Sequence, residues 1–99
     1  MQIEIRSIHF KADRKLEDFI NEKIEKLSQF YDGVLSAEVA LKLDNNDSAD
    51  NKIAEVILNV RGSELYAKKQ SKSFEESVDN AADALRKQIV RYKEKQRRS

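Results

Sequence analysis

The spacing of apolar residues changes twice along the chain, and this change constrains the fold more than any other feature. Near the N-terminus apolar residues alternate with polar ones, as Ile3 and Ile5 do around Glu4. Residues 14–30 and 74–98 carry apolar side chains at helical spacing, and three alternating segments lie between them. Alternation is typical of a half-buried strand, and helical spacing of an amphipathic helix. The pattern therefore predicts the order β-α-β-β-β-α.

A suitable capping residue precedes each predicted helix. The Asp13 carboxylate can accept hydrogen bonds from the free amides of the first helix. Ser73 and Glu76 have the spacing of a capping box at the start of the second. Gly33 is expected to end the first helix by adopting a positive φ. The predicted apolar stripes are Leu16, Phe19, Ile20, Ile24, Leu27 and Phe30 in the first helix, and Phe74, Val78, Ala81, Ala82, Leu85, Ile89 and Tyr92 in the second.

The predicted strands cover residues 2–10, 35–43, 53–61 and 64–72. The first changes phase at Ser7, where we expect a bulge. A polar loop, 44–51, follows the second strand, and Gly62-Ser63 is predicted as the tight turn between the last two. One four-stranded sheet with two helices packed on one face would bury every apolar stripe, so the predicted fold class is α+β. The inward side chains would include Val39, Leu41, Leu43, Ala54, Val56, Leu58, Val60, Leu65 and Ala67.

Length and composition narrow the class of protein. The chain has 99 residues, enough for one hydrophobic core, so we expect residues 1–99 to form a single domain. It contains no Cys, so a disulfide-stabilised extracellular protein is not expected. Apolar runs are short and the N-terminus has no apolar signal segment, so we expect no membrane partner and no secretion. We therefore expect a cytoplasmic protein.

The net charge of +1 conceals a strong asymmetry along the chain. Residues 1–84 carry 12 basic and 17 acidic side chains, a balance of −5. Residues 85–99 carry 7 basic side chains and one acidic side chain, a balance of +6. Cations at a helix C-terminus complement the helix dipole, but that effect accounts for one or two of them and not for all. The excess favours a polyanionic partner over a solvated helix end.

The basic residues of the second helix form two stripes beside its apolar seam. Like charges at this spacing repel one another unless an anion lies opposite. The chain has no zinc finger, helix-turn-helix or base-stacking strand pattern, so we do not expect DNA as a partner. We expect cations on a rigid helix to contact the phosphates of structured RNA. At 100° per residue, Lys87, Arg91, Lys95 and Arg98 share one side, and Arg86, Lys93 and Arg97 share the other.

Catalysis and metal binding have weak support in the sequence. The only histidine, His9, is predicted on the first strand, with no nucleophile placed beside it. Asp44, Asp47 and Asp50 are three residues apart, whereas a calcium loop requires ligands at alternate positions and a Gly. With only two glycines, the chain has no glycine-rich phosphate loop. We therefore expect a non-enzyme with no metal site and no cofactor.

Lysines outside the second helix leave two interpretations open. Lys68, Lys69 and Lys72 precede that helix and could extend its basic surface, or they could protect an edge strand from pairing. Alternation does not settle the strand face of Lys69. In the first helix Lys23 and Lys26 lie among acidic residues, so periodicity alone favours solvated ion pairs for them.

Three segments of the chain resemble a known family. They are residues 16–27 in the first helix, 62–67 at the last turn and 78–95 in the second helix. The strongest is Leu85-Arg86-Lys87-Gln88-Ile89-Val90-Arg91-Tyr92-Lys93-Glu94-Lys95, which is specific in combination with the predicted element order. On these segments the chain resembles the ribosome hibernation-promoting factors, a family that includes the ribosome-associated translation inhibitor once called a sigma-factor modulation protein.

The resemblance implies both a fold and a function. Members of that family have the fold predicted above and bind the small ribosomal subunit in the channel between its head and body. There they overlap the mRNA path and the A- and P-site tRNA positions, so that translation stops and idle ribosomes are preserved in stationary phase or starvation. For this chain the resemblance implies ribosomal RNA as the partner, and we expect a monomer away from the ribosome.

The resemblance also implies which residues contact RNA. In the first helix Lys23 and Lys26 match basic positions of the family, which strengthens them as candidates. The charge pattern, and not the family motif, adds Arg86, Lys93, Arg97 and Arg98. On the second helix the matching positions are Lys87, Arg91 and Lys95, with Gln88 beside them.

The chain departs from the family pattern in two places. Many members have Asp-Met-Tyr before the second helix, where this chain has Ser73-Phe74-Glu75, so a role of that Tyr would be lost or transferred to Phe74. Long members carry a further C-terminal domain that joins two ribosomes, and we expect this chain to be a short form. The alternative is a small α+β protein-interaction module whose basic helix docks an acidic protein partner, and such a module would be indifferent to ribosomal RNA.

Overall fold

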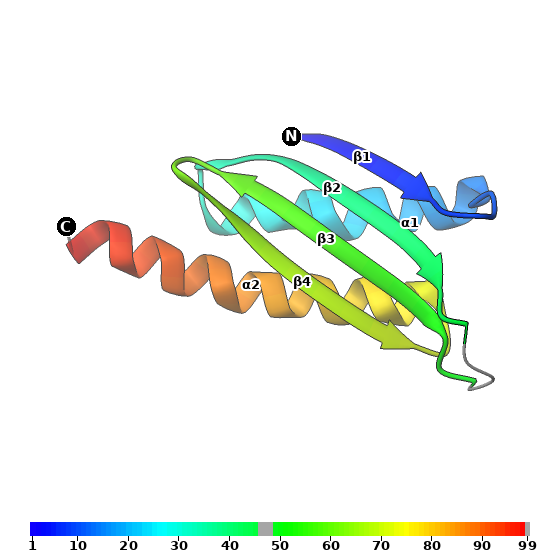
Figure 1. The fold of residues 1–99 in the computed structure, drawn as a ribbon. Coiled ribbons are helices and arrows are strands. Elements are labelled where there is room, and N and C mark those ends of the chain that lie inside the picture. Colours follow the sequence, from blue (N-terminus) through cyan, green and yellow to red (C-terminus); the bar gives the residue numbers. More distant parts are fainter. Residues whose placement is uncertain (46–48, 99) are drawn as a thin grey trace.

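The secondary structure follows the predicted order along the chain, which confirms the α+β fold class (Figure 1). The structure is a computed structural model that describes residues 1–45 and 49–98, with only the backbone described for Arg97 and Arg98. The elements are β1 (Gln2–Ser7), α1 (Arg14–Glu25), the 3-10 helix η1 (Lys26–Phe30), β2 (Val34–Leu43), β3 (Lys52–Val60), β4 (Ser63–Ser71) and α2 (Phe74–Arg98).

The four strands form one mixed sheet in the order β1-β2-β3-β4. β1 is parallel to β2 because α1 carries the chain back between them, and the other pairs are antiparallel. Both helices lie against the same face of the sheet, behind the strands in Figure 1. The opposite face, which no helix of the described chain covers, is called the open face below.

The hydrophobic core lies between the sheet and the two helices. Val39, Leu41, Val56 and Leu58 on the sheet are at most 1% exposed. Leu43, predicted to face inward, is 46% exposed because it is the last residue of β2 and lies outside the packed core. Burial of each large aliphatic side chain contributes about 1.5–3 kcal/mol, so both helices are firmly held. Their fully buried side chains include Ile20, Ile24, Val78, Leu85 and Ile89.

Both predicted helix caps are present. Asp13 accepts a hydrogen bond from the Leu16 amide at 2.8 Å. The Ser73 hydroxyl accepts one from the Glu76 amide at 3.1 Å, which is the hydroxyl half of the capping box. One turn further, the buried Ser77 hydroxyl donates to the backbone oxygen of the first residue of β3 at 2.6 Å. These bonds fix where α2 starts and tie that start to the sheet.

The first helix ends differently from the prediction. α1 stops at Glu25, and the segment predicted as its last turns is the 3-10 helix η1. Gly33 does not adopt a positive φ. Instead, the Tyr31 ring lies so close to Gly33 that an added Cβ would be 2.4 Å from two ring carbons. A close approach of an aromatic ring, and not a backbone conformation, therefore requires glycine there.

The turns at the strand ends also differ from the prediction. β1 ends at Ser7 without a bulge in its pairing with β2. His9 therefore lies after the strand and not on it, with a φ of 66° as the chain turns toward α1. The β3–β4 pairing places the tight turn at Arg61-Gly62, one residue earlier than predicted. Gly62 supplies the positive φ, 88°, that the turn requires.

Candidate RNA interface

α2 divides into an acidic first half that is firmly packed and a basic second half that is not. Its acids, from Glu75 to Asp83, lie on the same turns as the buried residues Val78 and Leu85. Among the described residues after Ile89, no side chain is fully buried. Figure 1 shows the red C-terminal turns of α2 continuing past the β3–β4 turn. The basic turns are thus held by the core at one end and exposed at the other.

The candidate lysines Lys23, in α1, and Lys26, at the start of η1, are paired with acids. Lys23 Nζ lies 3.1 Å from Asp79 of α2 and 5.6 Å from the centre of the Phe19 ring. Lys26 Nζ lies 3.6 Å from Glu22, one turn earlier in α1. Exposed pairs of this kind contribute at most about 1 kcal/mol each and exchange partners easily. Both lysines are available to an anion, at the cost of a weak existing contact.

Asp83 holds two of the candidate cations of α2. Its carboxylate accepts a hydrogen bond from Arg86 at 3.1 Å and lies 3.5 Å from Lys87 Nζ. The Arg86 hydrogen bond, together with the nearby Lys87 charge, holds the pKa of Asp83 below its usual range. The single negative charge of Asp83 therefore offsets one of the two positive charges on the first basic turn of the helix.

In the next two turns of α2 the acid is Glu94, and it forms no ion pair among the described side chains. Among the described residues, the side chains of Arg91, Lys93 and Lys95 form no ion pair and no hydrogen bond. Arg91 and Lys95 are one turn apart on the same side of α2, so their charges repel each other. The unpaired cations are therefore concentrated where the helix is least covered by the rest of the protein.

The structure settles the face of Lys69, which the sequence left open. Lys69 pairs in register with Ala54, so it lies on the helix side of the sheet, while Lys68 lies on the open face. Together with Lys87 and Arg91 it lines a hollow of about 430 Å³ between β4 and α2. Lys69 therefore extends the predicted basic stripe. Lys69, Lys87, Arg91 and Lys95 are called the cationic stripe below.

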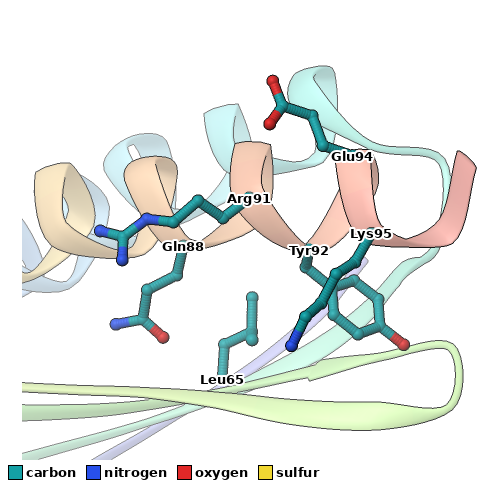
Figure 2. Close-up of a pocket in the computed structure, with 6 residues that line it drawn as sticks. All are labelled: Leu65, Gln88, Arg91, Tyr92, Glu94 and Lys95. Atoms are coloured by element: carbon teal, nitrogen blue, oxygen red, sulfur yellow. The ribbon is translucent and has the colours of Figure 1, made fainter. Parts of the chain in front are cut away.

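A second hollow between α2 and β4, called the α2–β4 groove below, lies beside the cationic stripe (Figure 2). Its volume is about 410 Å³. In Figure 2, Leu65 of β4 points toward the helix, Gln88 and Tyr92 point down toward the strand, and Glu94 points away. The groove is lined by Leu65, Gln88, Arg91, Tyr92, Glu94 and Lys95.

Two polar side chains of the α2–β4 groove are fixed by hydrogen bonds. Gln88 Nε2 donates to the backbone oxygen of Tyr66 at 2.8 Å, and Tyr92 Oη donates to that of Arg61 at 2.7 Å. The Tyr92 ring also meets Tyr31 edge to face, with ring centres 5.8 Å apart. Gln88, predicted on the basis of the family resemblance, therefore joins α2 to the edge of the sheet.

Lys93 lies on the other side of the helix. It lines a separate hollow of about 360 Å³ with Tyr31, Asp32 and Arg61 among others. Arg61 was not predicted as a site residue, because only the β3–β4 turn brings it beside α2. The structure thus places Lys93 with Arg61, on the opposite side of α2 from the cationic stripe.

The predicted site residues therefore do not form one cluster. Lys23 pairs with Asp79 of α2. Asp79 is twelve residues before Arg91 in the same helix, so the two positions are about 18 Å apart along the helix axis. Arg86 and Lys87 lie between these two positions. Arg97 and Arg98 continue the helix, with side chains outside the description.

Other kinds of site have little support in the structure. His9 is exposed and forms no side-chain hydrogen bond within the described residues. Asp44 and Asp50 flank the β2–β3 loop, while Asp47 lies outside the described residues. Among residues 1–45 and 49–98, no three His, Cys, Asp or Glu side chains are grouped in a way that could hold a metal ion. No described helix is long and apolar enough to cross a membrane.

Two ribosome hibernation promoting factors are similar to this chain over nearly its full length. It is 30% identical over 96 residues to the ribosome hibernation promoting factor of Azotobacter vinelandii, covering 97% of this chain and 86% of that protein. It is 27% identical over 95 residues to the factor of the same name from Klebsiella oxytoca, covering 96% of each.

Solved structures support the same fold. The N-terminal domain of Thermus thermophilus Protein Y superposes with a TM-score of 0.81 at 22% identity, over 93% of this chain and 99% of that one. A ribosomal subunit interface protein from Coxiella burnetii gives 0.83 at 18% identity, over 94% and 98%. The family described as Sigma 54 modulation protein / S30EA ribosomal protein matches residues 3–97. The chain belongs to this family.

Proposed function

We propose that the protein is a ribosome hibernation factor that binds ribosomal RNA on the small subunit and inhibits translation by occlusion. It would occupy the channel for mRNA and tRNA when cells enter stationary phase or stress. The name shared by its relatives supports an association with the ribosome. The observation that carries the proposal is the set of unpaired cations, Arg91, Lys93 and Lys95, on the exposed turns of α2.

Occlusion requires a rigid body and an anionic partner, and no chemical step. The core holds α2 up to Ile89, so the cations beyond it project from a fixed base. RNA phosphates would relieve the repulsion between Arg91 and Lys95 and release bound counterions. Such contacts position a protein on RNA through charge and shape, without reading a sequence.

The candidate residues differ in the ion pairs that they would have to break in order to bind RNA. Arg91, Lys93 and Lys95 would lose no existing contact. Arg86 and Lys87 would exchange Asp83 for phosphate. In the same way Lys23 and Lys26 would exchange their partners in α2 and α1. In this proposal residues 1–99 act as one cytoplasmic, non-catalytic domain that is monomeric away from the ribosome.

The test is co-sedimentation with salt-washed bacterial ribosomes on a sucrose gradient. Wild-type protein is expected to migrate with small subunits and intact monosomes. The triple variant Lys87→Glu, Arg91→Glu and Lys95→Glu should remain at the top, because three attractive contacts become repulsive. It should keep its circular dichroism spectrum, since all three side chains are exposed.

A matched control changes the same charge at the far end of the molecule. Lys11, Arg14 and Lys15 are exposed at the start of α1, which Figure 1 places at the opposite end from the C-terminus of α2. Their reversal to Glu should leave co-sedimentation intact. Wild-type protein that stays at the top of the gradient would refute the function and favour an acidic protein partner for the basic helix.

A further inference from the structure

The α2–β4 groove has an exposed apolar floor in the middle of a cationic surface. Leu65 has the inward phase of β4, yet it is only half-buried. At this level the side chains that α2 contributes to the groove are polar or charged apart from the Tyr92 ring, so no aliphatic side chain among the described residues of the helix covers Leu65. Phosphate binding by Arg91 and Lys95 does not require an apolar floor. The groove therefore has a feature that the proposed function leaves unexplained.

The walls of the α2–β4 groove are held in place before any ligand arrives. Tyr92 is fixed by its hydrogen bond to Arg61 and its edge contact with Tyr31. Because the bond to a backbone oxygen requires the amide nitrogen of Gln88, its Oε1 is directed elsewhere. Figure 2 shows this oxygen on the side of Leu65. A fixed acceptor thus faces the apolar floor.

These groups match the parts of one nucleotide. A base has apolar faces that can rest on Leu65 and the Tyr92 ring. Its edge carries N–H groups that can donate a hydrogen bond to Gln88 Oε1. Its phosphates require cations at the rim, where Arg91 and Lys95 lie. A volume of about 410 Å³ is within the usual range for a small-molecule pocket. The one carboxylate in the lining, Glu94, points away from the groove.

We propose that the α2–β4 groove receives an unpaired base of a single-stranded RNA segment, with the flanking phosphates on Arg91 and Lys95. The source of that segment in the cell, ribosomal RNA, rests on the proposed function. A base within a duplex cannot enter, because its faces are stacked and its edge is paired. The groove thus selects unpaired over paired RNA, which the cationic stripe alone does not.

The test compares two RNA oligomers of equal charge by fluorescence anisotropy. One is a short single-stranded adenosine oligomer, and the other has the same backbone with abasic nucleotides throughout. Wild-type protein is expected to bind the base-bearing oligomer about tenfold more tightly. Equal affinities would overturn the proposal, because charge is then the whole of the interaction.

The variant Leu65→Ser removes the floor without changing the charge. It should bring the affinity ratio close to one while leaving binding to the abasic oligomer unchanged. Leu43→Ser, a matched exposed position at the end of β2, should keep the wild-type ratio. A ratio that survives Leu65→Ser in a folded protein would overturn the groove assignment, as would an acidic peptide whose binding depends on Leu65.

The two proposals fail in different ways. Co-sedimentation with ribosomes, together with no preference for bases, would refute the groove and keep the function. A base preference lost in Leu65→Ser, without any binding to ribosomes, would refute the function and keep the groove.

Discussion

The open face of the sheet and the exposed turns of α2 both carry several charges, but among the described side chains only the open face contains an ion pair. On the open face Glu55 forms an ion pair with Lys42 and accepts a hydrogen bond from Tyr66 at 3.3 Å. Lys68 lies opposite Glu55 in register. On α2, Arg91 and Lys95 have no acid partner within the described side chains. Charges that are paired internally stabilise the fold, whereas unpaired like charges favour an external anion.

The largest expected effects come from reversing two charges, which should weaken ribosome binding when they lie on α2 and lower the stability when they lie on the open face. Arg91→Glu with Lys95→Glu should weaken ribosome binding at least about a hundredfold, because two charge-assisted contacts are lost. The melting temperature should change little, because both side chains are exposed and neither forms an ion pair within the described side chains. Filter binding to labelled small subunits and thermal melts would measure both quantities.

The reciprocal variant reverses two charges on the open face. Lys42→Glu with Lys68→Glu leaves Glu55 beside two new carboxylates, so the melting temperature should fall. Ribosome affinity should stay within about twofold of the wild type. If the open-face variant lost binding while the α2 variant kept it, the two surfaces would have the opposite roles.

Salt dependence sharpens the comparison one residue at a time. Arg91→Gln should reduce the slope of log K against log salt by about 0.7–0.9, the value for one phosphate contact. Lys68→Gln, with the same loss of charge on the open face, should leave the slope unchanged. Titrations of ribosome binding over a range of KCl concentrations give both slopes. Equal slopes for the two variants would mean that the protein responds only to net charge.

The fold was predictable because burial alone determines most of it. The alternating residues of β3 and the helical stripe of α2 are the residues that the structure buries. The errors occur at element ends, where burial gives no signal. Gly33 depends on the position of the Tyr31 ring, and Leu43 depends on where the packed core stops. Such details follow from tertiary contacts that periodicity does not contain.

The sequence predicted how the basic residues are arranged around α2, but not which of them form ion pairs with acids. Helical periodicity correctly grouped Arg91 with Lys95 and separated Lys93 from them. It did not reveal that Asp79 pairs with Lys23, because those residues are distant in sequence and meet only when α1 packs on α2. Periodicity left the face of Lys69 open, and the register of β4 with β3 shows that it lies on the helix side, beside a hollow at the sheet edge.

A smaller effect is expected from removing an internal competitor. Asp83 is the shared ion-pair partner of Arg86 and Lys87, so Asp83→Asn should release both cations and strengthen ribosome binding about two- to fivefold. Glu76→Gln is the matched control, because it removes one exposed negative charge from the same helix without breaking an ion pair. Equal gains for both variants in the filter-binding assay would assign the effect to net charge instead.

The smallest expected effects are in the pH dependence of the two paired acids. The Lys42 hydrogen bond and charge hold the pKa of Glu55 below its usual range, as Arg86 does for Asp83. A carboxyl whose folded pKa is lowered stabilises the fold above its unfolded pKa, and this contribution is lost as pH falls through the folded pKa. Lys42→Met should therefore raise the Glu55 pKa and flatten the acid side of the stability profile.

Carboxyl NMR titration can separate the two acids in one experiment. When a single-stranded RNA oligomer binds, Arg86 and Lys87 turn toward phosphate, so the pKa of Asp83 should rise toward its usual value. Glu55 keeps its Lys42 partner on the opposite side of the sheet, so its pKa should not move. A shift of Glu55 with a constant Asp83 would place the RNA on the open face. The same titration therefore decides which surface exchanges its internal partners for an external anion.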